Sequence, residues 1–153
     1  MSKKYKIFTE CKKNSIDEQA KTLGFAFWIA MQCPEYCLFR LIDLRAWLMP
    51  AIQHKQIMLF FDAFDNPIGY VTWANLAADA EDRLLNDPNF LLHECEWDEG
   101  NRTWIIDCCF PFGGAVFAMP ELRGKFISQS ISSVHWARRA GDYSVRKVVS
   151  CTV

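Results

Sequence analysis

Hydrophobic residues recur at helical spacing near the start of the chain, and two prolines divide this region. The segment SIDE (15–18) forms a capping box, and apolar positions follow it as far as Met31. Pro34 marks the end of this helix. A second helix is expected over 35–49, because Pro50 lacks a backbone donor and clashes with the preceding turn. Two helices are therefore predicted before the first strand.

Apolar runs separated by turn signals predict strands in the middle of the chain. The run QIMLFFDAFDNPIGYVTWANL (56–76) is expected to form two strands around the turn FDNP, because aspartate and asparagine bond their own backbone in turns. A short helix should follow, beginning at Asn75 or the alanines after it and ending near Leu85. After a loop, DEGN (98–101) is the turn that leads into the next strand.

The segment RTWIIDCCF (102–110) is predicted to be a central strand, since both of its alternating faces are largely apolar. One face would carry Thr103, Ile105, Asp107 and Cys109. The other would carry Trp104, Ile106, Cys108 and Phe110. A helix from about Ala115 to Arg139, interrupted near Pro120, should follow. A last strand in GDYSVRKVVSC (141–151) completes the predicted elements.

This order of elements predicts the fold class α/β, with helices flanking a mixed central sheet whose strands are buried on both sides. The 153 residues suffice for one hydrophobic core. A single domain is therefore expected over 15–153, preceded by a basic, mobile N-terminus at 1–14. Hydrophobic residues make up 51% of the chain, which argues against disorder.

Charge and hydropathy exclude several classes of partner. The formal net charge is −1, which gives no electrostatic reason to bind nucleic acid or an anionic membrane. The chain contains no run of 18 apolar residues, and its start lacks the apolar core of a signal peptide. A cytoplasmic protein without a transmembrane segment is therefore expected.

The seven cysteines are expected to be free thiols, most of them small buried hydrophobic side chains. Cys33 and Cys37 are four residues apart, Cys108 and Cys109 are adjacent, and no C-x-x-C pair occurs. Adjacent residues on a strand point to opposite faces, so Cys108 and Cys109 would not reach one ion. No metal site is predicted.

Asp107 is the residue that most needs an explanation, because it lies in the middle of an apolar strand. An ionised carboxylate in a dry core costs several kcal/mol unless a partner satisfies it. A functional role is favoured. The alternative is a structural carboxylate that pairs with Arg40 or Arg45, or that caps the helix after Gly114. We expect a carboxylate oxygen of Asp107 within hydrogen-bond reach of another side chain.

Three segments resemble the RTX toxin-activating lysine acyltransferase family: RTWIIDCCFPFGG (102–114), TWANL (72–76) and LMPAI (48–52). The pattern W-x-x-D-x-x-x-P-F-G is built here from Trp104, Asp107, Pro111, Phe112 and Gly113. The similarity runs from about Leu23 to Val149. It implies the GNAT-like acyltransferase fold and a cytoplasmic enzyme that moves a fatty acyl chain from acyl carrier protein to lysines of a secreted pore-forming toxin.

No cofactor is expected. The glycine-rich pyrophosphate loop of GNAT enzymes is missing, and Arg123-Gly124-Lys125 is too short to replace it. This argues against coenzyme A as the acyl donor and fits the family's use of a carrier protein.

The resemblance also implies a site, in which Asp107 works beside a histidine that acts as base. That histidine falls on Tyr36 in CPEYC, and a family asparagine falls on Trp47. Tyrosine has an unperturbed pKa of about 10, so at neutral pH it is a poor base but can donate a proton or a hydrogen bond. Asp107 and Tyr36 are the predicted catalytic residues. Cys37 is a weaker candidate nucleophile, because no positive neighbour is expected to activate its thiol.

Aromatic and glycine residues are the predicted substrate-binding groups. Tryptophan and tyrosine rings stack on sugars and catechols, and glycine lets a ligand approach the backbone. The predicted set is Trp47, Trp73, Asn75, Trp104, Gly113 and Gly114. An ordinary strand-to-helix turn is the alternative for the two glycines.

Three functions are open. The replaced histidine and the many aromatic residues favour a branch that resembles microcin-maturation proteins, which help join a glucosylated catecholate siderophore to the C-terminal serine carboxylate of a microcin by an ester bond. The first alternative is lysine acylation of an RTX toxin. The second is a non-catalytic scaffolding subunit. The expected partners are a toxin or microcin precursor peptide, a second maturation subunit or a second copy of this chain, and, for lysine acylation, acyl carrier protein.

Overall fold

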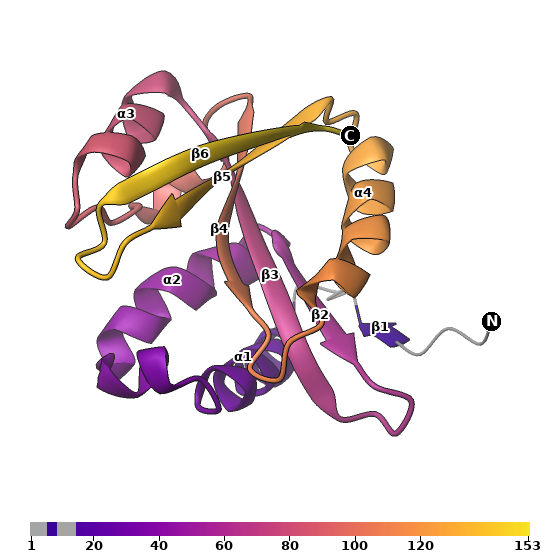
Figure 1. The fold of residues 1–153 in the computed structure, drawn as a ribbon. Helices are drawn as coiled ribbons and strands as arrows, with labels where there is room; N and C mark the ends of the chain where they lie inside the picture. Colours follow the sequence, from indigo (N-terminus) through magenta and orange to yellow (C-terminus); the bar gives the residue numbers. More distant parts are fainter. Residues whose placement is uncertain (1–5, 9–14) are drawn as a thin grey trace.

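A mixed six-stranded sheet organises the chain (Figure 1). The computed structural model describes residues 6–8 and 15–153. Neighbouring strands follow one another in chain order, and the pairs are antiparallel except β4 and β5, which are parallel. The bounds of β1 to β6 are Lys6–Phe8, Ile57–Phe61, Pro67–Leu76, Arg102–Cys109, Ser133–Arg139 and Val145–Thr152. The rest of the N-terminus predicted to be mobile, 1–5 and 9–14, lies outside the described residues.

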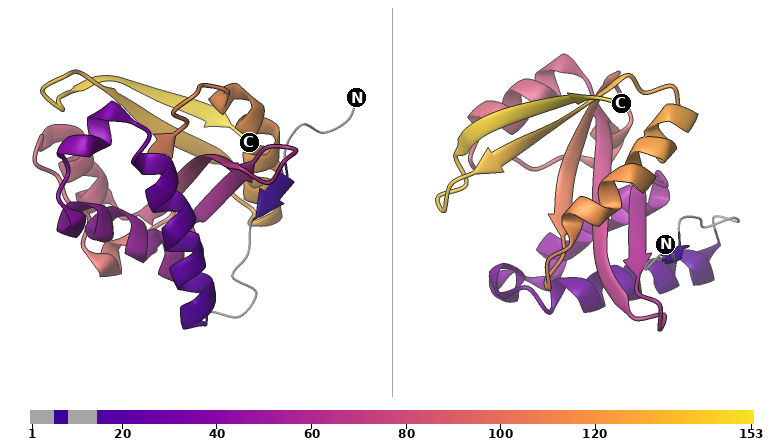
Figure 2. Two further views of the ribbon diagram at one scale, coloured as in Figure 1. Left: turned by 90° about the horizontal axis from the view of Figure 1, so that it is seen from below. Right: turned by 45° about the vertical axis from the view of Figure 1, so that its right-hand side comes forward.

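Helices cover both faces of this sheet, as Figure 1 and Figure 2 show. α1 (Ile16–Ala30) and α2 (Leu41–Gln53) lie on one face, and α4 (Met119–Ser128) lies on the other. The remaining helices are α3 (Ala78–Asn86) and the short 3-10 helices η1 (Pro34–Leu38), η2 (Glu94–Trp97) and η3 (Ala115–Ala118). This arrangement confirms the predicted α/β class with a mixed sheet flanked by helices.

Two hydrophobic cores form, one on each face of the sheet. The larger core packs α1 and α2 against β2, β3 and β4, and Ile29, Leu48 and Trp104 are almost fully buried in it. The smaller core packs η3 and α4 against the opposite face. There the rings of Trp73 and Phe126 meet edge to face, with centroids 5.2 Å apart. Alternate residues of β2 contribute to the two cores, so this strand is buried on both sides as predicted.

The first helix and the following hairpin confirm the hydrophobic pattern. The Ser15 hydroxyl accepts from the backbone N–H of Glu18 at 3.4 Å and caps α1. In the turn between β2 and β3, the Asp62 carboxylate accepts from the backbone N–H groups of Phe64 at 2.8 Å and Asn66 at 2.9 Å. One aspartate therefore holds the turn together.

The predicted second helix is wrong in both of its bounds. The segment 35–49 divides into η1 and α2, which are separated by extended backbone at Phe39, and α2 continues through Pro50. Proline removes one helical hydrogen bond. The continued helix buries Ala51 and Ile52 in the larger core, and this burial offsets the loss.

The predicted helix over 115–139 is wrong in its second half. η3 and α4 account for the first part, and Ser130 then adopts a left-handed φ of 58° that ends the helix. The segment 133–139 is β5, which pairs with β6 on one side and with β4 on the other. Hydrogen bonds to two neighbouring strands outweigh local helical preference, as strand formation depends strongly on context.

A β-bulge in β4 changes which residues share a face. Thr72 pairs with Asp107 and Trp73 pairs with Ile105, so Ile106 is an extra residue without a partner on β3. The side chains that point toward α1 and α2 are those of Trp104, Ile106, Asp107 and Cys109. Ile105 packs on the opposite face, in the smaller core. The predicted alternation, which placed Asp107 and Ile105 on one face, is therefore wrong.

Gly100 closes the turn before β4 against the end of β3. Its N–H donates to the Asn75 carbonyl at 2.9 Å, and an added Cβ would lie 1.9 Å from the backbone oxygen of Leu76. Backbone atoms cannot move aside as the ends of side chains can. Gly100→Ala is therefore expected to lower the free energy of unfolding by about 2 to 3 kcal/mol, measured by urea unfolding.

The control for this variant is Gly24→Ala. Gly24 lies inside α1, and nothing lies within 4 Å of an added Cβ there. That variant should be slightly more stable than the wild type, because alanine favours helix. Equal unfolding midpoints for Gly100→Ala and the wild type would contradict the packing of this turn.

Candidate active site

Two tyrosine hydroxyl groups hold the Asp107 carboxylate, one on each oxygen. Tyr36 donates a short hydrogen bond to Oδ1, and Tyr70 donates to Oδ2 at 2.8 Å. The prediction that a carboxylate oxygen bonds another side chain is confirmed, and the predicted pair of Tyr36 and Asp107 is in direct contact. The carboxylate therefore bonds two tyrosines and not Arg40 or Arg45, which were the expected partners in the structural alternative. Arg40 forms an ion pair with Asp43 at the exposed start of α2.

Three elements bring these groups together. The bulge at Ile106 turns Asp107 toward the face that α1 and α2 cover. Tyr70 lies on β3 and reaches the carboxylate diagonally across the β3–β4 pair. Tyr36 comes from η1, between α1 and α2. Its ring packs edge to face on Phe39, with centroids 5.3 Å apart, and this contact fixes its direction.

The environment of the three groups raises all of their pKa values. Burial raises the pKa of Asp107 above its ordinary value, although the hydrogen bonds from Tyr36 and Tyr70 oppose part of the rise. Burial and the nearby Asp107 charge raise the pKa of both tyrosines well above the usual value. Both phenols therefore stay protonated at neutral pH, and the carboxyl group is a stronger base than an exposed aspartate.

This arrangement can move a proton over two steps. Each oxygen of Asp107 accepts a hydrogen bond from a tyrosine, so a substrate proton can reach the carboxylate through a tyrosine. Tyr36 uses its single hydrogen toward Asp107, and its oxygen keeps the capacity to accept a proton. The pair can therefore act as one general base, with the Tyr36 oxygen as its outer atom.

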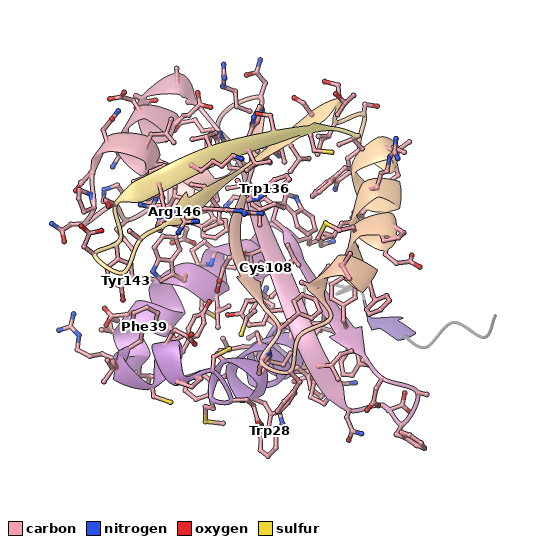
Figure 3. The ribbon with its side chains drawn as sticks, viewed as in Figure 1. Trp28, Phe39, Cys108, Trp136, Tyr143 and Arg146 are labelled. Atoms are coloured by element: carbon pink, nitrogen blue, oxygen red, sulfur yellow. The ribbon has the colours of Figure 1, made fainter. Side chains whose placement is uncertain are left out.

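β4 and β5 separate beside this carboxylate (Figure 2). Over the described residues they pair only between 103–105 and 134–136, although β4 continues to Cys109 and β5 to Arg139. The bulge that bends β4 lies at the same point. Figure 3 shows Cys108 on this separated part of β4. The edge of β4 that faces β5 is thus unpaired where Asp107 lies.

The three other predicted residues of β3 and β4 have structural contacts. Trp104 is on the same face as Asp107, but its indole N–H donates to Glu81 at 2.9 Å within the core. Trp73 is buried on the opposite face in the smaller core. Asn75 donates to the Asp98 carboxylate at 2.7 Å and accepts from the Thr103 hydroxyl at 2.8 Å. The structure does not bring Trp73 and Asn75 to the carboxylate, and their role in binding substrate stays a prediction.

The remaining predicted residues lie outside the strands. Trp47 of α2 is half-buried and packs against Phe90, with ring centroids 6.4 Å apart. Gly113 and Gly114 follow β4 with φ of 78° and 95°, a region that favours glycine. The turn into η3 requires this backbone, which matches the alternative expected for them. Their contact with a substrate stays a prediction.

Sequence reasoning missed two residues of β3 that face Asp107. Tyr70 bonds the carboxylate, and Thr72 is its cross-strand partner. The Thr72 hydroxyl is fully buried and has no hydrogen-bond partner among the described residues. Their alternate spacing in an apolar strand was the available signal, since two polar groups on one face of a central strand need partners.

Removal of the Tyr70 hydroxyl tests this site independently of catalysis. Tyr70→Phe leaves Oδ2 of Asp107 without a partner, so the free energy of unfolding should fall by about 1 to 3 kcal/mol at neutral pH. Tyr143→Phe is the matched control, because Tyr143 is exposed and should change stability little. Thermal unfolding of both variants measures the difference. If Tyr70→Phe and Tyr143→Phe lost the same amount of stability, Tyr70 would stabilise the fold only through its ring.

Within the described part of the chain, no three histidine, cysteine, aspartate or glutamate side chains are grouped so that they could hold a metal ion. The described helices include none with the length and apolar character needed to cross a membrane.

The fold is GNAT-like. A GNAT-family acetyltransferase from Listeria monocytogenes superposes with a TM-score of 0.55 over 97% of this chain and 95% of that structure. The two sequences are 10% identical, so the likeness concerns the fold.

The sequence then places the chain within that class. The model of the HlyC family, RTX toxin acyltransferases, matches residues 15–150, and the chain belongs to this family. It is 38% identical over 91 residues to the leukotoxin-activating lysine-acyltransferase LktC of a Pasteurella haemolytica-like species, covering 60% of this chain and 54% of the relative. It is 32% identical over 112 residues to the protein-lysine myristoyltransferase HlyC of Escherichia coli, covering 73% and 65%. The chain thus spans about half to two thirds of the length of these relatives.

Proposed function

We propose that this protein transfers a fatty acyl chain from a thioester donor to lysine side chains of an RTX toxin precursor. The observation that carries the proposal is the half-buried Asp107 carboxylate, which is bonded to the Tyr36 hydroxyl on the part of β4 that has separated from β5. A lysine amine must lose a proton when it becomes an amide, and a base with a raised pKa is suited to take it.

The similar proteins favour lysine acylation over siderophore attachment to a microcin, the function that the sequence favoured. The relatives are named as toxin-activating lysine acyltransferases and as a protein-lysine myristoyltransferase. Siderophore attachment to a microcin, which the sequence analysis preferred because the family histidine is replaced, has no support among them. The contact between Tyr36 and Asp107 also weakens that reason, because it supplies a proton acceptor at the histidine position.

The proposed reaction conserves every proton. The neutral lysine nitrogen attacks the carbonyl carbon of the thioester, the C–N bond forms, and the C–S bond breaks. One proton leaves the nitrogen for the Tyr36 oxygen as the Tyr36 proton passes to Oδ1 of Asp107. Asp107 then returns a proton through Tyr36 to the departing thiolate sulfur. Tyr36 stays neutral before and after the step, in agreement with its raised pKa.

The partners follow from this reaction as further proposals. The donor is an acyl carrier protein and the acceptor is the toxin precursor, in the cytoplasm, with no separate cofactor. Exposed apolar side chains beside Tyr36, at Leu38, Leu41 and Ile42, support contact with another protein. That protein is the carrier, the toxin, a second maturation subunit or a second copy of this chain.

Reconstitution with purified components tests the proposal. The protein is mixed with myristoyl-acyl carrier protein and a lysine-containing segment of an RTX toxin, and mass spectrometry maps any acylated lysine. The expected result is an amide-linked acyl chain that forms only with the protein present. An ester at a C-terminal carboxylate instead would support the microcin prediction. No transfer unless a second subunit is added, together with full activity of Asp107→Asn in that mixture, would support the scaffolding alternative.

A further inference from the structure

A second contact joins the same two segments as the hydrogen bond between Tyr36 and Asp107. The Sγ atoms of Cys33 and Cys109 are 3.2 Å apart. Cys33 is the residue just before η1, three positions before Tyr36, and Cys109 ends β4, two positions after Asp107. Cys33 is half-buried and Cys109 is buried.

A disulfide needs the two sulfur atoms about 2.05 Å apart, so these thiols are about 1 Å from bonding distance. We propose that Cys33 and Cys109 form a reversible disulfide that changes the position of Tyr36 and switches the site off. In a reducing compartment the disulfides that do form are mostly transient or redox-sensing, and this pair is suited to that use.

The oxidant is a small disulfide such as oxidised glutathione. The half-buried Cys33 thiolate attacks it, so a Cys33–glutathione bond forms and one glutathione thiolate leaves. The Cys109 thiolate then displaces the second glutathione, and the Cys33–Cys109 bond forms as the mixed disulfide breaks. The two thiol protons end on two molecules of reduced glutathione. Burial raises the pKa of Cys109, so the second step should speed up as the pH rises.

The cross-link would act on the site through η1. Tyr36 already touches the Asp107 carboxylate, so drawing the start of η1 closer to β4 forces the Tyr36 ring to turn away from Oδ1. A misplacement of about 1 Å can lower a rate by about a hundredfold. Oxidation should therefore lower acyl transfer strongly, and reduction should restore it.

Two neighbouring cysteines could compete, and they provide the matched controls. Cys108 is next to Cys109 but lies on the exposed side of β4, and Cys37 is exposed four residues after Cys33. Among the described residues, neither Sγ atom forms a contact with another sulfur. Cys108→Ser and Cys37→Ser should keep the cross-link, whereas Cys33→Ser and Cys109→Ala should abolish it.

The experiment incubates the full chain with oxidised glutathione, traps free thiols with iodoacetamide and measures the intact mass and the digested peptides without reduction. The expected product lacks two hydrogens, carries the peptides of Cys33 and Cys109 joined, and reverts with dithiothreitol. Its Tm should rise by about 5 °C or more, because the bond closes a long loop. A mixed disulfide with glutathione as the stable product, or a cross-link to Cys37 or Cys108, would overturn the proposal.

The loss of activity rests on the proposed function and is measured separately in the lysine acylation assay. The oxidised wild type should be at least about tenfold slower than the reduced form, and Cys33→Ser should be insensitive to oxidised glutathione. A cross-linked protein that acylates lysine at the full rate would overturn the switch. If the reduced protein has no transfer activity, the proposed function fails. Hydrogen exchange of the η1 backbone then tests whether the cross-link moves the segment that carries Tyr36. Unchanged exchange after cross-linking would overturn the proposal that the disulfide repositions Tyr36.

Discussion

Asp107→Asn is expected to lower the rate of lysine acylation by about a thousandfold, with the protein still folded. The amide keeps the shape of the carboxyl group and can still accept from Tyr36, but it cannot take the proton that the relay delivers. General bases contribute about 10² to 10⁴ to rates, and a thousandfold loss is the middle of that range. Single-turnover acylation by mass spectrometry measures the effect.

The stability of the same variant gives a control with a defined pH dependence. Burial raises the folded pKa of Asp107 above its unfolded value of about 3.9. Ionisation of this group therefore costs the wild type stability as the pH rises from about 4 through the raised pKa. Asp107→Asn has no such loss, so its stability relative to the wild type should improve from acid to neutral pH. If the free energies of unfolding of the two proteins changed equally with pH, the pKa of Asp107 would not be raised in the folded protein.

Tyr36→Phe is expected to lower the rate by about a hundredfold, which is the second largest effect. The substitution keeps the ring that packs on Phe39 but leaves Oδ1 of Asp107 without its partner, so the free energy of unfolding should fall by about 1 to 3 kcal/mol, as for Tyr70→Phe, and the protein should stay folded. Without the phenol oxygen, the substrate proton has no path to Oδ1 of Asp107. A rate equal to that of the wild type would show that the substrate reaches Asp107 by another route.

A second substitution at this position separates chemistry from packing. The resemblance places the histidine of the family at Tyr36, and an imidazole can also accept a proton while it donates to a carboxylate. Tyr36→His should therefore keep a larger share of the activity than Tyr36→Phe, and its rate should fall at acid pH as the imidazole becomes charged. Equal loss in both variants would mean that the phenol is needed for a reason other than proton transfer.

Local chemistry explains why much of the architecture could be predicted. The SIDE box, the FDNP turn and the apolar runs on either side of it each depend on neighbouring residues, and α1, β2 and β3 formed where expected. The same holds for Asp107, because the penalty for an unpaired carboxylate requires a partner in any fold. The identity of that partner was not local: Tyr36 is 71 positions away, and the resemblance to a family with a histidine there pointed to it.

The wrong predictions concern long-range pairing. Pro50 reads locally as a helix stop, but core contacts of Ala51 and Ile52 carry the helix past it. The local pattern of 133–139 predicts the end of a helix, but the segment forms a strand that pairs with β4 and β6. Tyr70 lacked any chemical motif, and only the pairing of β3 with β4 places its hydroxyl on Asp107.

The extra residue at Ile106 means that the spacing of β4, and not only its composition, encodes the chemistry. If the same residues paired with β3 without the bulge, strict alternation would turn Asp107 toward α4, away from Tyr36 and Tyr70. Isoleucine at this position can be exchanged for another apolar residue without that reversal. Related chains that keep two residues between Trp104 and Asp107 should therefore keep the bulge, whichever apolar side chain occupies it.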